Sequence, residues 1–169
     1  MFIYIFPGGA ARLLYNLEKS DLRRNILALR KKLSAEDVDI LSKKIANTLI
    51  SLDIFKNSEV IALYVPIKNE VDLISLLAEK GKRFLFPRVE TGTKKLTFYE
   101  AKSPDDFEKG SFNIPEPKTT LNKVDIENID LFLVPGVAFD FQIVDSGFSE
   151  PFDERLDAVA TDERIIINN

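Results

Sequence analysis

The chain has 169 residues, 45% of them hydrophobic and 30% charged, a length and balance typical of one globular domain. Its formal charge of −4 differs from that of a dedicated nucleic-acid binder, which is usually basic. Cys and His are both absent, which excludes disulfides, thiolate or imidazole metal sites, and nucleophiles that depend on either residue. The side chains that remain suit phosphoryl transfer, and the lack of Cys fits a cytoplasmic location, which we expect.

The N-terminus begins with an apolar run from Met1 to Phe6, followed by Pro7-Gly8-Gly9. Such a run is too short to span a bilayer, and no basic segment precedes it, so we expect neither a membrane anchor nor a signal peptide. Two alternatives remain open for these residues, an added strand and a disordered extension.

Two helices are expected next. Apolar residues spaced i, i+4, i+7 and i+11 predict a helix over residues 20–33 with one apolar stripe, formed by Leu22, Ile26, Leu29 and Leu33. Ser34, followed by acidic residues, is a typical N-cap for a second helix. The buried face of that helix is predicted to carry Val38, Leu41, Ile45, Leu49 and Leu52.

Short apolar segments alternate with helical patterns in the rest of the chain. We expect strands at residues 59–65, 83–86, 96–99 and 131–134, and one or two more at 158–161 and 165–167. A helix is predicted over 71–80. Pro87 is expected to end the strand at 83–86, and residues 103–124 are loop-rich. This alternation predicts an α/β fold with a mostly parallel sheet.

Six strings, in order along residues 19–168, resemble those of one protein family. They are Lys19 to Arg23 (K-x-x-L-R), Leu63 to Asp72, Phe86 to Val89, Gly110 to Pro117, Val134 to Asp140 (P-G-V-A-F-D) and Phe152 to Thr161. Together they resemble the 5-formyltetrahydrofolate cyclo-ligase (5,10-methenyltetrahydrofolate synthetase) family. The resemblance implies a three-layer α/β/α fold with a mostly parallel central sheet, similar to NagB/RpiA/CoA-transferase-like proteins. It implies a single domain over residues 19–169, with 1–18 as an atypical extension.

The chain departs from the family pattern after Asp140. There the family continues with a glycine-rich string similar to R-L-G-x-G-x-G-Y-Y-D, a helix and a second strand. Here Asp140 runs directly into Phe141-Gln142, and no other glycines in the chain reproduce the missing spacing. The difference matters because glycine-rich loops let backbone N–H groups approach phosphates closely.

The resemblance implies ATP-dependent cyclisation of 5-formyltetrahydrofolate to 5,10-methenyltetrahydrofolate, with Mg²⁺ as a cofactor. The partners it implies are this small-molecule substrate and neither nucleic acid nor membrane. Lys19 and Arg23 would contact ATP, and a helix would place them on one face with Arg30. Asp153 would bind Mg²⁺. The alternatives are a solvated basic surface for the cations and a capping role for Asp153.

For the folate, the resemblance implies contacts from Val65, Glu70 and Phe112. A carboxylate at position 70 can accept hydrogen bonds from the pterin, and an aromatic ring at 112 can stack on it. Alternatively, Glu70 is an exposed or helix-capping acid and Phe112 anchors its loop.

Three hypotheses about function therefore stand. The chain is a cyclo-ligase, or a non-catalytic folate-binding protein on the same fold, or a truncated chain that completes its sheet by self-association. The sequence does not determine the oligomeric state.

Overall fold

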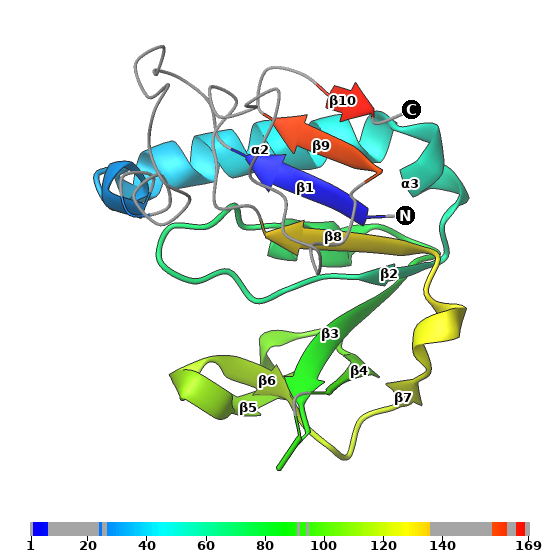
Figure 1. The fold of residues 1–169 in the computed structure, drawn as a ribbon. Coiled ribbons are helices and arrows are strands. Elements are labelled where there is room, and N and C mark those ends of the chain that lie inside the picture. Colours follow the sequence, from blue (N-terminus) through cyan, green and yellow to red (C-terminus); the bar gives the residue numbers. More distant parts are fainter. Residues whose placement is uncertain are drawn as a thin grey trace, which may run out of the picture.

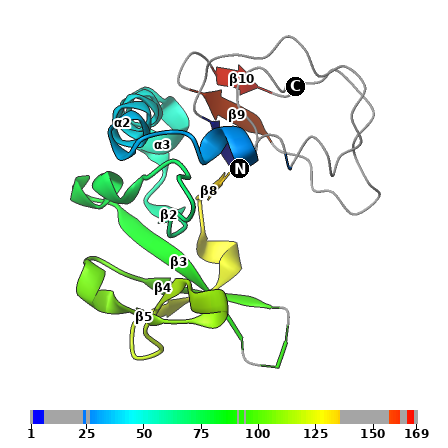
Figure 2. The same ribbon diagram turned by 90° about the vertical axis from the view of Figure 1, so that its left-hand side faces the viewer.

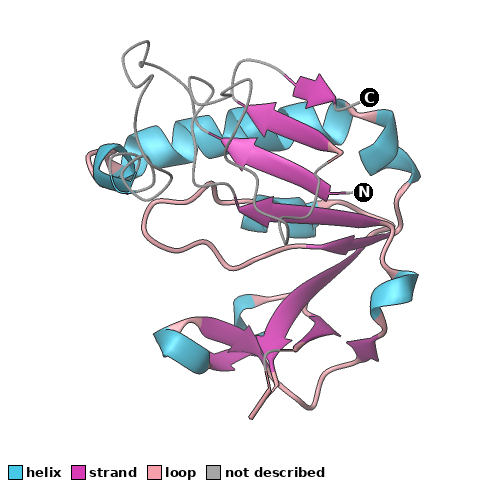
Figure 3. Ribbon diagram, viewed as in Figure 1, coloured by secondary structure: helices cyan, strands magenta, loops and turns pink. Residues whose placement is uncertain are grey.

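The computed structural model describes residues 2–6, 24, 27–90, 92–93, 95–135, 157–161 and 165–167 (Figure 1). Residues 27–30 are helical. They are followed by the helices α2 (Ala35–Ser51) and α3 (Asp53–Asn57) and by the 3-10 turns η1 (Ile74–Ala78), η2 (Pro104–Asp106), η3 (Ser111–Asn113) and η4 (Ile126–Asn128). The strands are β1 (Phe2–Phe6), β2 (Val60–Ala62), β3 (Arg83–Val89), β4 (Leu96–Glu100), β5 (Phe107–Lys109), β6 (Pro115–Pro117), β7 (Lys123–Val124), β8 (Leu131–Pro135), β9 (Ala158–Thr161) and β10 (Ile165–Ile167) (Figure 3). No helix in these ranges has the length and apolar character needed to cross a bilayer.

An eight-stranded sheet with the order β10-β9-β1-β8-β2-β3-β4-β7 forms the centre of the molecule. Strands β9, β1, β8, β2 and β3 pair in parallel, whereas β10, β4 and β7 pair antiparallel with their neighbours. Strands β5 and β6 form a separate antiparallel pair. The predicted α/β class and the mostly parallel sheet are confirmed.

The N-terminal apolar run forms a strand inside this sheet. Strand β1 lies between β8 and β9, with Tyr4 in register with Val134 on one side and with Val159 on the other (Figure 1). Of the two alternatives for these residues, the structure therefore shows the added strand. The position is internal, so β1 links β9 and β10 to the rest of the sheet.

Helix α2 packs on one face of the sheet, on the same side as α3 (Figure 2). Its start is the predicted one: the Ser34 hydroxyl accepts a hydrogen bond from the Asp37 N–H, and the Asp37 carboxylate accepts one from the Ser34 N–H. Ile45 and Leu49 are fully buried against alternate residues of the strands, among them Ile61 and Leu131. The opposite face has its own cluster of buried residues: Val60, Ala62, Leu85, Phe98 and Ile129.

Three local predictions are wrong. Residues 71–80 do not form an α-helix but a short 3-10 turn, because Val71 and Leu73 are both buried, a spacing of two that fits extended chain. Pro87 does not end β3. Phe84 and Glu90 form their backbone hydrogen bonds with residues on the β4 side, and successive residues of a strand alternate between its two sides. Pro87, which has no N–H to donate, therefore faces the other side, where β2 has already ended. Leu29 is 37% exposed, so it does not belong to a buried stripe.

Candidate functional site

A pocket of about 240 Å³ lies beyond the carboxyl ends of the parallel strands β2, β3 and β8. In α/β sheets this edge is where ligands bind. The walls are mainly apolar, and they come from the strand ends and from the loop that carries η3 and β6. The lining residues are Tyr64, Val65, Ile67, Glu70, Pro87, Val89, Leu96, Ser111, Ile114, Pro115, Glu116 and Pro135.

Glu70 enters this pocket from a tight turn. The Glu70 N–H donates to the Ile67 carbonyl at 3.1 Å, and Lys68 and Asn69 between them have φ values of 49° and 61°. Two successive non-glycine residues in the left-handed region are strained, which is typical of functional sites. The turn also closes on itself, because the Ile67 N–H donates to Glu70 Oε2 at 3.0 Å. The Glu70 side chain is 12% exposed and is held in one orientation.

The turn is fastened to residues 30–33, at the end of the helical residues 27–30. Arg30 Nη2 lies 3.4 Å from Glu70 Oε1, and Asn69 Nδ2 donates to the carbonyls of Arg30 and Leu33 at 3.2 and 3.0 Å. Arg30 is 5% exposed, so the ion pair is largely shielded from water. Residues 30–33 and the turn therefore position Glu70 together.

Tyr64 is a structural residue of the pocket lining. Its hydroxyl donates to the Val71 carbonyl at 2.6 Å. Burial raises the pKa of Tyr64 well above its usual range, and the negative charges of Glu70 and Asp72 raise it further. Tyr64 thus keeps its proton and acts as a structural donor.

Glu116 is the second carboxylate of the lining and is 6% exposed. Arg88 Nε lies 3.8 Å from its Oε2, and Arg88 Nη1 donates to Glu108 Oε1 and to the Pro117 carbonyl, both at 2.7 Å. Gly110 packs so closely on Glu116 that a Cβ there would collide with the Glu116 side chain. The Gly110–Pro117 loop therefore fits tightly around this carboxylate.

The sequence-predicted folate residues fall at this pocket in part. Val65 and Glu70 line it. Phe112 lies in η3 beside the lining residue Ser111, and its side chain lies outside what the structure describes. Sequence reasoning missed Tyr64 and Glu116, although both belong to strings that carry the family resemblance.

The predicted phosphate and metal ligands Lys19, Arg23 and Asp153 lie outside the described residues. Within the described ranges, no three carboxylates gather in a set that could hold a metal ion. Arg30 does fit an anion, because its Nε and Nη1 atoms are buried and have no hydrogen-bond partner there.

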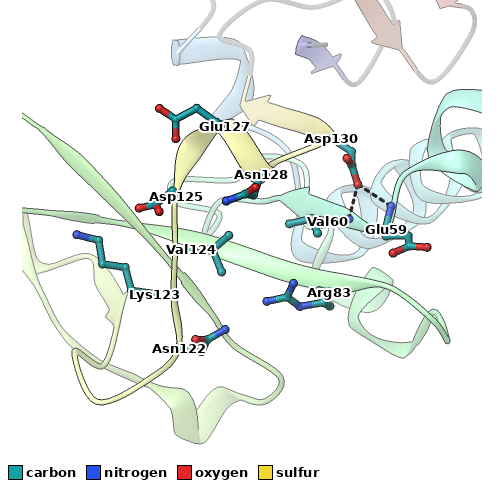
Figure 4. A pocket seen from close by; sticks show the side chains of 10 residues that line it. All are labelled: Glu59, Val60, Arg83, Asn122, Lys123, Val124, Asp125, Glu127, Asn128 and Asp130. Atoms are coloured by element: carbon teal, nitrogen blue, oxygen red, sulfur yellow. Dashed lines mark hydrogen bonds between the residues drawn. The ribbon is translucent and has the colours of Figure 1, made fainter.

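A larger cavity of about 570 Å³ lies at the opposite, amino-terminal ends of β2 and β3 (Figure 4). Two of its charged side chains already have partners within the fold. Asp130 Oδ2 accepts from the N–H groups of Glu59 and Val60 at 2.9 and 2.8 Å, and Arg83 pairs with Glu100 at 2.9 Å. Because of its position and this internal pairing, we assign the site to the smaller pocket.

The fold and the pocket define a class of α/β protein that binds a small molecule at the carboxyl edge of a mostly parallel sheet. The sequence profile of the 5-formyltetrahydrofolate cyclo-ligase family matches residues 16–155, and the chain belongs to this family. No curated protein sequence matches the chain.

Two solved structures are similar to this fold. The NMR structure of Aquifex aeolicus 5,10-methenyltetrahydrofolate synthetase is 29% identical, with a TM-score of 0.72 over 88% of this chain and 92% of that one. A 5,10-methenyltetrahydrofolate synthetase from Mycoplasma pneumoniae is 28% identical, with a TM-score of 0.52 over 70% of this chain and 63% of that one.

Proposed function

We propose that this chain binds 5-formyltetrahydrofolate and converts it, with ATP and Mg²⁺, to 5,10-methenyltetrahydrofolate in the cytoplasm. Membership of the cyclo-ligase family supports the reaction. The observation that carries the placement of the substrate is the apolar pocket at the carboxyl ends of β2, β3 and β8, with Glu70 held inside it. We also propose that residues 19–169 form one domain, to which the extension 1–18 contributes β1.

The folate ring system is proposed to lie in this pocket. Val65 would pack on the flat pterin, Glu70 would accept hydrogen bonds from its N–H groups, and Phe112 would stack on it. The volume of about 240 Å³ is below the roughly 300–1,000 Å³ of pockets that enclose a whole drug-sized ligand. The pocket therefore suits one ring system, with the rest of the folate outside.

For the cofactors we propose Lys19 and Arg23 as ATP contacts and Asp153 as a ligand of Mg²⁺, following the family pattern. When bound, ATP supplies the phosphoryl group that turns the formyl oxygen into a leaving group, so that N10 can attack the formyl carbon. Among the described residues, Arg30 supports an anion-binding role for this region. Two of its buried guanidinium nitrogens have no hydrogen-bond partner in the described part of the chain, and they could bind an anionic oxygen.

A second function, non-catalytic folate binding, is favoured by one feature of the sequence. Asp140 is followed directly by Phe141, without the glycine-rich string that holds phosphates in the family pattern. Loss of such a cradle typically removes several kcal/mol of transition-state stabilisation. A truncated, self-associating chain is the third possibility.

An absorbance assay for the methenyl product, with ATP and Mg²⁺, separates these functions. Product formation by the wild type that falls when Glu70 becomes Gln would support the enzyme. A matched control is Glu127→Gln, which alters an exposed glutamate of the other cavity. Calorimetric binding of 5-formyltetrahydrofolate without turnover would identify a binder, and large particles in light scattering without binding would identify self-association. An intact-mass measurement confirms the 169-residue chain used in each assay.

A further inference from the structure

The Glu116 carboxylate lacks hydrogen-bond donors. The residue is 6% exposed, no described residue donates a hydrogen bond to its side chain, and its carboxylate oxygens remain accessible to solvent. Its nearest cationic atom is Arg88 Nε at 3.8 Å, beyond hydrogen-bond distance. An accessible carboxylate that lines a pocket and has free acceptor positions points to a ligand with donor groups.

Glu70, the other carboxylate of the pocket, differs in this respect. Its Oε1 faces Arg30 Nη2 and its Oε2 accepts from the Ile67 N–H, so each oxygen already has a partner. A carboxylate offers about four acceptor positions, and the Glu116 side chain has none of its own filled within the described ranges. The larger unused acceptor capacity of the pocket therefore lies at Glu116.

The surroundings hold Glu116 at the pocket. Its backbone pairs with Glu108 across β5 and β6, and the Gly110 backbone packs directly on its side chain. Arg88, the neighbouring cation, is itself fixed by Glu108 and the Pro117 carbonyl. A carboxylate supported in this way is preorganised, so a ligand need not order it on binding.

We propose that Glu116 is a second ligand-binding carboxylate of this pocket, which accepts a pair of N–H donors from a flat heterocycle. An amino group beside a ring N–H matches a carboxylate in the two-point manner of a guanidinium. This inference rests on the proposed function: the pair is the 2-amino group and neighbouring ring N–H of the pterin, and Glu70 accepts from a remaining N–H of the ring system. The apolar walls would cover the faces of the ring.

Calorimetry with two probes tests the proposal. The probes are 5-formyltetrahydrofolate and the same molecule with a methyl group in place of the 2-amino group. For the wild type we expect the analogue to bind about 10- to 100-fold more weakly, the usual effect of a hydrogen bond to a charged group. Glu116→Gln should weaken the natural ligand by a similar factor and nearly abolish the difference between the probes. Glu127→Gln, in the other cavity, should change neither.

Glu116→Asp provides a second variant that keeps the charge beside Arg88 but withdraws the carboxylate by one methylene. We expect it to fold and to lose at least about tenfold of the discrimination between the two probes. If the wild type binds 5-formyltetrahydrofolate and both variants keep full discrimination, the role of Glu116 is refuted while the proposed function stands. If the wild type binds neither probe, the proposed function fails as well.

Discussion

Replacing Gly110 by Ala perturbs a single contact. The backbone at Gly110 has φ −106° and ψ −156°, an extended conformation open to any residue, so the substitution introduces no backbone strain. The new Cβ would collide with Cγ, Cδ and Oε2 of Glu116. Because Cγ is among these atoms, the Glu116 side chain must change its rotamer and cannot relieve the collision by shifting its carboxylate alone. Overpacking of this kind costs about 1–3 kcal/mol of unfolding free energy.

The partner substitution Glu116→Ala removes all three atoms of the collision. In that background Gly110→Ala causes no collision, and it should raise the unfolding free energy by about 0.4–1 kcal/mol because Ala restricts the unfolded chain. The two substitutions should therefore be coupled by about 1.4–4 kcal/mol, the sum of the two effects. Urea unfolding of the wild type, both single variants and the double variant measures this coupling, provided that the m-value stays constant.

Gly92 provides the control. A Cβ there meets nothing within 4 Å, but φ is +79°, so Gly92→Ala should destabilise through the backbone alone. Its cost should be the same with and without Glu116→Ala, to within about 0.5 kcal/mol. If Gly110→Ala also proves additive with Glu116→Ala at that level, the close packing of loop and carboxylate is refuted.

Three further predictions concern other parts of the fold. Asn69→Ala removes the hydrogen bonds to the Arg30 and Leu33 carbonyls and places Ala at a φ of 61°, so it should lower the unfolding free energy by about 2–3 kcal/mol in urea. Asn69→Gly loses the same bonds without the strain and should cost less; equal costs would contradict the strained turn. Backbone N–H groups, first that of Lys102, lower the pKa of Asp106. The ionised Asp106 should therefore stabilise the fold fully above the unfolded pKa of about 3.9, and this stabilisation should be lost as pH falls through the folded pKa. The difference in unfolding free energy between the wild type and Asp106→Asn should shrink over that range, and a constant difference from pH 7 to 3 would refute this. Tyr4→Pro removes an N–H from an internal strand and should cost at least about 2 kcal/mol more than Tyr4→Val, measured by thermal or urea unfolding; equal costs would contradict the central place of β1.

Local sequence signals predicted the elements whose stability depends on neighbouring residues. The Ser34 cap and the spacing of Ile45 and Leu49 predicted α2, because a helix satisfies its own backbone and buries one face. Strand β8 was predicted from its apolar run. The string that contains Val65 and Glu70 pointed to them as candidate site residues, and both line the pocket. The family assignment rested on the order of such strings, and the family match confirms it.

Tertiary contacts decided the rest. Whether residues 2–6 form a strand depends on β8 and β9, which are more than a hundred residues away in the sequence. Pro87 is tolerated within β3 because β2 ends before reaching it. Glu116 lines the site because β6 pairs with β5 and the Gly110 backbone packs on its side chain. In each case the deciding hydrogen bond or contact comes from a strand or loop whose position no local pattern encodes, since a sheet is stabilised by pairing between distant segments.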